Sequence, residues 1–173
     1  MPAIPDHLQQ QLNILFVGFN PSLRSGEVGH HYANPRNRFW NILYRSGLTP
    51  RLYHPDEDGD LLELGYGFTN IVSRPTRGID DILPEEYAEG RVELREKIAQ
   101  YRPRIACFVG KGVYTKYSQR SQAPWGIQSE PVTEGVVEFV APSSSGLVRM
   151  PLDDIIDIYR ELRIYANGEQ DND

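Results

Sequence analysis

The stretch that decides the fold class is residues 13–19, NILFVGF. Most of its side chains are apolar, and β-branched and aromatic residues predominate, which is typical of a strand buried on both faces of a parallel sheet. The stretch runs directly into Asn20-Pro21, a pair that favours a turn. We therefore expect a central buried strand whose carboxyl end is followed at once by a polar side chain.

Short apolar runs and helical patterns alternate through the rest of the chain. Further strands are expected at 66–72, 105–109 and 136–141, and helices at 37–46, 83–101, 111–119 and 151–165. Residues 22–35 contain Gly26, Gly29 and Pro35 and are interpreted as a loop. Strands that alternate with helices predict one α/β domain, with a mostly parallel four- to five-stranded sheet and helices on both faces.

A chain of 173 residues suits a single domain, which we place at 12–165. Residues 1–11 are interpreted as a short N-terminal lead, for which a helix is one option, and the polar residues 166–173 as a disordered tail. No apolar run approaches the ~20 residues that a membrane span needs, and the N-terminus lacks the pattern of a signal peptide. We expect a cytoplasmic, bacterial, monomeric protein with no membrane partner.

The distribution of charge matters more than the net charge of −6, which by itself argues against binding to nucleic acid. Residues 20–51 contain five arginines and one acid, Glu27. An acidic protein with one basic face can bind DNA with a strong salt dependence, although a merely solvated basic surface is the alternative. Cys107, the one cysteine, lies in the apolar run IACFVG and is expected in the core. A single cysteine excludes an internal disulfide, a CxxC zinc site and a four-cysteine cluster, and we expect no metal and no cofactor.

Polar segments follow each predicted strand, at 20–22, 73–76, 110–111 and 142–147. Ligands of parallel sheets bind beyond the carboxyl ends of the strands, so these segments are expected to meet at one edge. The Asn20 amide can accept from a water and donate to a carbonyl at once, although a plain Asn-Pro turn is the alternative. Tyr32 lies in a polar loop and could stack on a nucleobase, whereas helical spacing favours a core position for Trp40.

The loop at 142–149 combines three serines with Gly146, Leu147 and Arg149. Hydroxyls and an arginine suit phosphate contacts, and an exposed apolar side chain suits a wedge between bases. A loop without function is the alternative. The VGKG stretch at 109–112 matches neither a Walker motif nor a dinucleotide fingerprint, so nucleotide-phosphate binding receives little weight.

Six short motifs together resemble one known family. They are GFNPS at 18–22, GHHY at 29–32, NRFW at 37–40, GFTN at 67–70, RPT at 74–76 and PSSSGL at 142–147. Their order and spacing are similar to those of the mismatch-specific uracil-DNA glycosylase and thymine-DNA glycosylase family, from residue 12 to about residue 163. GHHY and GFTN resemble the thymine-DNA glycosylase branch, but Ser22 stands where that branch commonly has glycine. The resemblance implies a three-layer α/β/α fold of the uracil-DNA glycosylase type.

The resemblance also implies roles for the matching residues. Asn20 and Thr76 would hold the attacking water. The residues that would bind the substrate base are Phe19, His31, Tyr32, Asn37, Asn70 and Ser143. The residues that would contact the DNA are Ser144, Ser145, Gly146, Leu147 and Arg149. Among them, Tyr32 would stack on the flipped base and Leu147 would fill the hole that the base leaves.

The implied activity is excision of uracil, with thymine and modified pyrimidines as further candidates, from G·U or G·T mismatches in double-stranded DNA. An amide does not take up a proton at neutral pH, so Asn20 can position a water but cannot act as a base. No lysine stands just after Asn20 to form a Schiff base, which predicts an abasic product without strand cleavage. Two alternatives stay open: a flavodoxin-like enzyme that binds a nucleotide or phosphoester, and a non-catalytic DNA-binding module that does not need Asn20 or Thr76.

Overall fold

The apolar stretch forms the central strand of a five-stranded sheet in a computed structural model that describes residues 3–168. The strand order is β2-β1-β3-β5-β4. The bounds are β1 Ile14–Gly18, β2 Tyr66–Asn70, β3 Ile105–Val109, β4 Gly126–Ile127 and β5 Val137–Ala141. Four strands pair in parallel, and only the two-residue edge strand β4 is antiparallel. The predicted mostly parallel sheet is confirmed.

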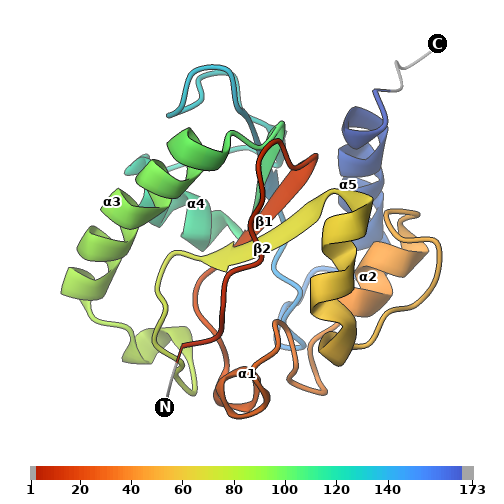
Figure 1. The fold of residues 1–173 in the computed structure, drawn as a ribbon, viewed down its shortest axis with the longest axis horizontal. Coiled ribbons are helices and arrows are strands. Elements are labelled where there is room, and N and C mark those ends of the chain that lie inside the picture. The colour runs from red at the N-terminus through yellow and green to blue at the C-terminus, as the bar shows by residue number, and fades with distance from the viewer. Residues whose placement is uncertain (1–2, 169–173) are drawn as a thin grey trace.

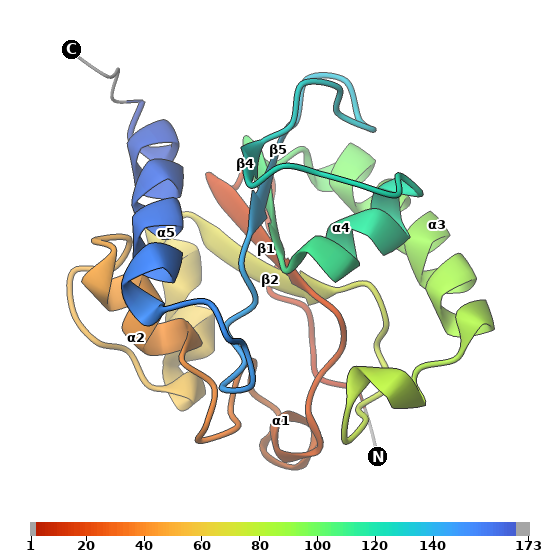
Figure 2. The ribbon, with the colours of Figure 1, turned by 180° about the vertical axis from the view of Figure 1, so that it is seen from behind.

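Helices cover both faces of this sheet, as predicted (Figures 1 and 2). One layer contains α2 (Phe39–Arg45), α5 (Leu152–Ala166) and the 3₁₀ helix η1 (Pro55–Leu64), and the other contains α3 (Pro84–Tyr101) and α4 (Lys111–Ser118). Successive β1 side chains point to opposite faces, so Ile14 and Phe16 join one core cluster while Leu15 and Val17 join the other. All of β1 is therefore buried, which explains why its sequence is continuously apolar.

The parallel register brings the carboxyl ends of the strands to one edge. Gly18, the last residue of β1, pairs with Asn70 of β2, and Val109 of β3 pairs with Ala141 of β5. In Figure 1 this edge faces α1 (Leu23–Val28) at the bottom of the molecule. The polar segments that follow the strands start from this edge.

Several local expectations were wrong. The predicted loop at 22–35 contains α1, because the Ser22 hydroxyl accepts from the Ser25 N–H at its start and Gly29 ends it with φ 76°. We did not predict η1, the short helix η2 (Ile79–Asp81) or β4. The described part of the lead, residues 3–11, contains no helix.

The lead instead lies beside β2. His7 and Phe68 exchange backbone hydrogen bonds of 2.9 and 3.0 Å. Helix α5 continues to Ala166, one residue into the predicted tail, and the expectation of disorder at 169–173 lies outside the described residues. Within residues 3–168, none of the helices combines the length and apolar character that crossing a membrane requires.

Candidate functional site

A pocket of about 140 Å³ lies at the carboxyl edge of the sheet. Its volume is several times the ~30 Å³ of one water, a scale that suits a single planar ring. Eight of the residues predicted from the sequence line it: Phe19, Asn20, His31, Tyr32, Asn37, Asn70, Ser143 and Ser144. Segments that are far apart in the chain therefore meet as expected.

The Asn20 amide has a defined orientation. Its Nδ2 donates to the Arg74 carbonyl and to Thr76 Oγ1, both at 2.8 Å. A backbone carbonyl can only accept, so the nitrogen end must face Arg74 and both of its hydrogens are used. Oδ1 is then the atom that can accept a hydrogen bond from a water.

Thr76 lies behind Asn20 and is absent from the pocket wall. Its side chain is 5% exposed, and its hydroxyl donates to the Gly78 carbonyl at 2.7 Å while it accepts from Asn20. The residue therefore acts on the amide of Asn20. The turn that carries it is held by Arg74, whose guanidinium pairs with Glu86 at 2.7 Å.

Tyr32 presents an aromatic face that is backed by another ring. It stacks on Phe39 with ring centroids 3.9 Å apart and an interplanar angle of 12°. Its φ of 53° is unusual for a residue with a side chain. The hydroxyl is buried, which raises its pKa, and it has no hydrogen-bond partner among residues 3–168.

Gly18 lets two pocket side chains converge. A Cβ at this position would lie 2.6 Å from Asn70 Oδ1 and 3.1 Å from the Tyr32 hydroxyl. The first distance is shorter than packed atoms tolerate, so a side chain at this position would push the Asn70 amide out of its observed place. The close approach explains the glycine of the GFNPS motif.

His31 is a neutral member of the pocket. Burial lowers the pKa of its imidazole from 6.5 to about 4. Nε2 lies 2.9 Å from the Pro5 carbonyl, which can only accept, so this nitrogen carries the proton and Nδ1 keeps its lone pair. The Pro5 contact was not foreseen, because nothing in the lead marks it as part of the site.

The hydrogen bonds that Phe19 and Asn37 make within the protein indicate which of their atoms can contact a base. The Phe19 carbonyl accepts from the Val72 N–H at 2.9 Å. A pyrimidine carbonyl can only accept, so the expected backbone contact from Phe19 would use its N–H. Asn37 Oδ1 accepts from the Phe39 N–H at 2.9 Å at the start of α2, which leaves its amide nitrogen for a ligand.

The serine loop divides into an inner and an outer part. Ser144 is 1% exposed and belongs to the pocket wall, whereas its expected contact with DNA stays a prediction. Gly146, Leu147 and Arg149 are exposed, and Leu147 is 89% exposed. Ser145 lies between these two parts.

Arg38, which the sequence indicated only as part of the basic stretch and of the NRFW motif, holds this loop in place. Its N–H donates to the Ser144 carbonyl at 2.9 Å, and its guanidinium donates to the Ser145 carbonyl at 3.1 Å. The pocket also contains residues that no motif singled out: Ile4, Ser25, Asn34, Ile79 and Val109. Only the tertiary structure could have found these.

One group in residues 3–168 could in principle hold a metal ion. Ligand atoms of His7, His31 and Asp58 lie within 4.8 Å of one another. Our expectation of no metal considered cysteine sites and not this group. Both Asp58 oxygens already accept hydrogen bonds, from the His30 ring and the His31 N–H. The carboxylate is therefore engaged within the protein.

The comparison with known families agrees with this geometry. Residues 5–163 match the model of the uracil DNA glycosylase superfamily. The chain belongs to this superfamily. A candidate uracil DNA glycosylase from Methanosarcina acetivorans, known from a solution NMR structure, shares the fold with a TM-score of 0.57 and 21% sequence identity. The alignment covers 94% of this chain and 98% of that one.

Membership of the superfamily supports DNA glycosylase activity, which is hydrolysis of an N-glycosyl bond in DNA. The expected three-layer α/β fold of a uracil DNA glycosylase is confirmed. The substrate preference within the superfamily and the roles of individual residues are taken up below.

Proposed function

We propose that this glycosylase removes uracil from G·U mismatches in double-stranded DNA. We propose that its pocket also admits thymine, from G·T mismatches, and modified pyrimidines. The observation that carries the proposal is the orientation of Asn20, whose amide nitrogen is held by two acceptors so that Oδ1 can hold a water. That water attacks C1′ of the sugar as the C1′–N1 bond breaks. The base leaves as an anion and is protonated at N1, and the proton of the water passes to solvent.

The base must first leave the duplex, which costs a few kcal/mol and least at a mismatch. Tyr32, backed by Phe39, offers a flat surface for the extruded ring. The Phe19 N–H and the Asn70 amide are donors for the pyrimidine carbonyls, where negative charge develops. Leu147 stands in solvent, where it can enter the vacated stack, and Arg149 is exposed two residues further on.

The DNA product is an abasic site in an intact strand. A Schiff-base mechanism needs a lysine amine at the sugar. Within the described part of the chain, the pocket wall contains no lysine. We therefore propose a monofunctional enzyme that acts as a monomer.

The test is excision from matched duplexes that contain G·U, A·U, G·T or no lesion, read as strand cleavage after alkali. We expect cleavage of G·U first, and no cleavage when alkali is omitted. Asn20→Ala removes the water-holding oxygen and should lose most of the single-turnover rate while duplex binding is retained. Full activity of Asn20→Ala would contradict the proposal.

Asn20→Asp is a sharper variant of the same test. A carboxylate can accept a proton from the water, so excision is expected to persist or rise. Aspartate also places an oxygen opposite the Arg74 carbonyl, where Asn20 donates a hydrogen bond. We therefore expect a lower unfolding temperature than in the wild type, measured on the same preparation.

A further inference from the structure

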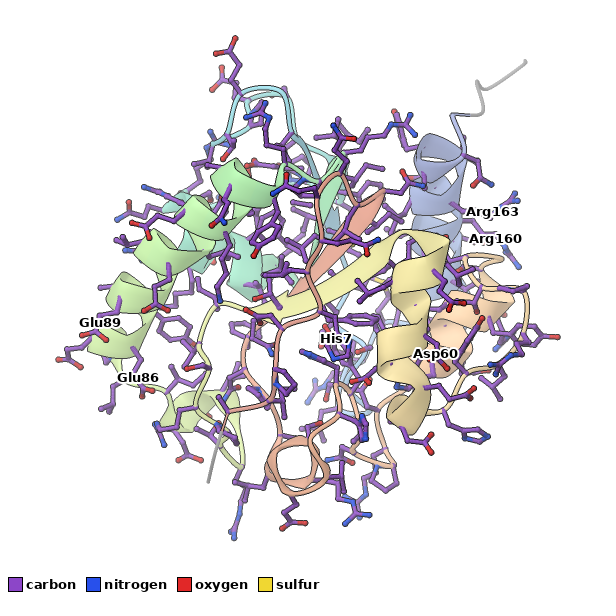
Figure 3. All side chains as sticks on the ribbon, in the orientation of Figure 1. His7, Asp60, Glu86, Glu89, Arg160 and Arg163 are labelled. Carbon is purple, nitrogen blue, oxygen red and sulfur yellow. The ribbon has the colours of Figure 1, made fainter. Side chains whose placement is uncertain are left out.

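A buried carboxylate lies behind the pocket on η1. The Asp58 side chain is 2% exposed. Within residues 3–168, the histidine rings found within 4.0 Å of its oxygens are His30, at 3.0 Å, and His7, at 3.6 Å. Figure 3 shows His7 between the N-terminal segment and η1, the helix that also carries Asp60. A buried carboxylate is costly unless donors surround it, so its partners indicate what it stabilises.

Two of the residues that Asp58 contacts, His30 and His31, belong to the segment that carries Tyr32. Asp58 Oδ2 accepts from the His31 backbone N–H at 2.8 Å, and Oδ1 lies 3.0 Å from His30 Nδ1. One carboxylate therefore binds the two residues that directly precede Tyr32. Hydrogen bonds to charged groups are stronger than those between neutral groups.

The remaining contacts of this segment use neutral groups. Trp40 Nε1 donates to the Tyr32 carbonyl at 3.2 Å, and the Ala33 N–H donates to Ser25 Oγ at 2.9 Å. Tyr32 itself has the unusual φ of 53°, which persists only where neighbouring contacts hold it. On the N-terminal side of Tyr32, the contact with a carboxylate is the one that Asp58 makes with His30 and His31.

We propose that Asp58 is a positioning residue that sets Tyr32 against the extruded base through His30 and His31. It does not contact the base, and it is absent from the pocket wall. This inference rests on the proposed function, because it assigns Asp58 to the same site. It predicts that loss of the carboxylate slows base capture and excision but leaves the outer DNA contacts intact.

The experiment compares Asp58→Ala and Asp58→Asn with Asp60→Ala, a control that removes an exposed carboxylate from the same helix. Single-turnover excision from G·U duplex gives a maximal rate and a half-saturating enzyme concentration. A 2-aminopurine next to the uracil reports base extrusion. We expect Asp58→Ala to lower the maximal rate and the extrusion signal by about 10- to 100-fold, with little change in half-saturation. Asp60→Ala should match the wild type.

Asp58→Asn keeps one oxygen to accept from the His31 N–H and should recover part of the rate. If Asp58→Ala does not fold, this variant carries the test, and it should still fall below Asp60→Ala. A loss confined to half-saturation, or rates equal to those of Asp60→Ala, would overturn the inference. So would one equivalent of bound Zn²⁺ whose removal by a chelator abolishes activity, because the cluster would then be a metal centre.

Hydrogen exchange of the His31 amide separates this inference from the proposed function. If the wild-type protein excises no pyrimidine, the proposed function is wrong. Hydrogen exchange still tests whether Asp58 stabilises the segment that contains His31 and Tyr32. The amide should be protected in the wild type and in Asp60→Ala, and should exchange faster in Asp58→Ala. Equal protection in all three proteins would overturn the inference.

Discussion

Thr76→Val is the most informative single change, because it alters the orientation of Asn20 without touching the pocket. The buried Thr76 hydroxyl is one of two acceptors for the Asn20 amide nitrogen and also donates to Gly78. Valine keeps the shape of threonine but removes this acceptor. A buried donor without its partner costs about 1–3 kcal/mol.

If this free energy destabilises the orientation of Asn20 that holds the water, the chemical step slows by about 5- to 150-fold, at roughly 1.4 kcal/mol per factor of ten. The assay is single-turnover excision from G·U duplex at saturating enzyme, with duplex affinity measured separately. Thr76→Ser keeps the hydroxyl and should retain most of the rate. A wild-type rate for Thr76→Val, or an equal loss in Thr76→Ser, would refute this reasoning.

Two further predictions concern stability and the wedge. The unfolded chain protonates His31 near pH 6.5 but the folded protein only near pH 4, so protons favour unfolding between these values. The free energy of unfolding should therefore fall by up to about 3 kcal/mol as the pH decreases from 6.5 to 4, and His31→Phe should flatten that slope in denaturant titrations. An unchanged slope would contradict the burial argument. Leu147→Ala should leave the unfolding temperature unchanged, because the side chain is 89% exposed, while it lowers the extrusion signal of 2-aminopurine. A normal signal would show that this side chain is not the wedge.

The elements that the sequence predicted well are those with long, regular patterns. The four parallel strands and helices α2, α3, α4 and α5 lie within a few residues of their expected bounds. Helix α1 was missed because Gly26 and Gly29 indicated a loop, whereas the Ser22 cap and the left-handed Gly29 produce a short helix. The 3₁₀ helix η1 was missed because its acidic sequence has only a weak apolar pattern.

Eight of the pocket residues were also accessible from the sequence, since each follows a predicted strand or belongs to a motif. The part that each of them plays in the site was not accessible from the sequence. Only the structure shows that Thr76 lies behind Asn20, to whose amide it is hydrogen-bonded, and that Ser144 lies in the pocket wall. Asp58 carried no signal, because within an acidic run nothing distinguishes a buried carboxylate from its exposed neighbours.

The sequence by itself determined the layered α/β fold and the edge where chemistry-bearing side chains gather. Apolar periodicity is a local property, and parallel strands necessarily end at the same side. Only the tertiary structure decided which hydrogen-bonding atoms are already used, as in the Asn20 amide and the Asp58 carboxylate. Those atoms are used by partners tens of residues away, and the distances involved depend on the packing of the whole chain.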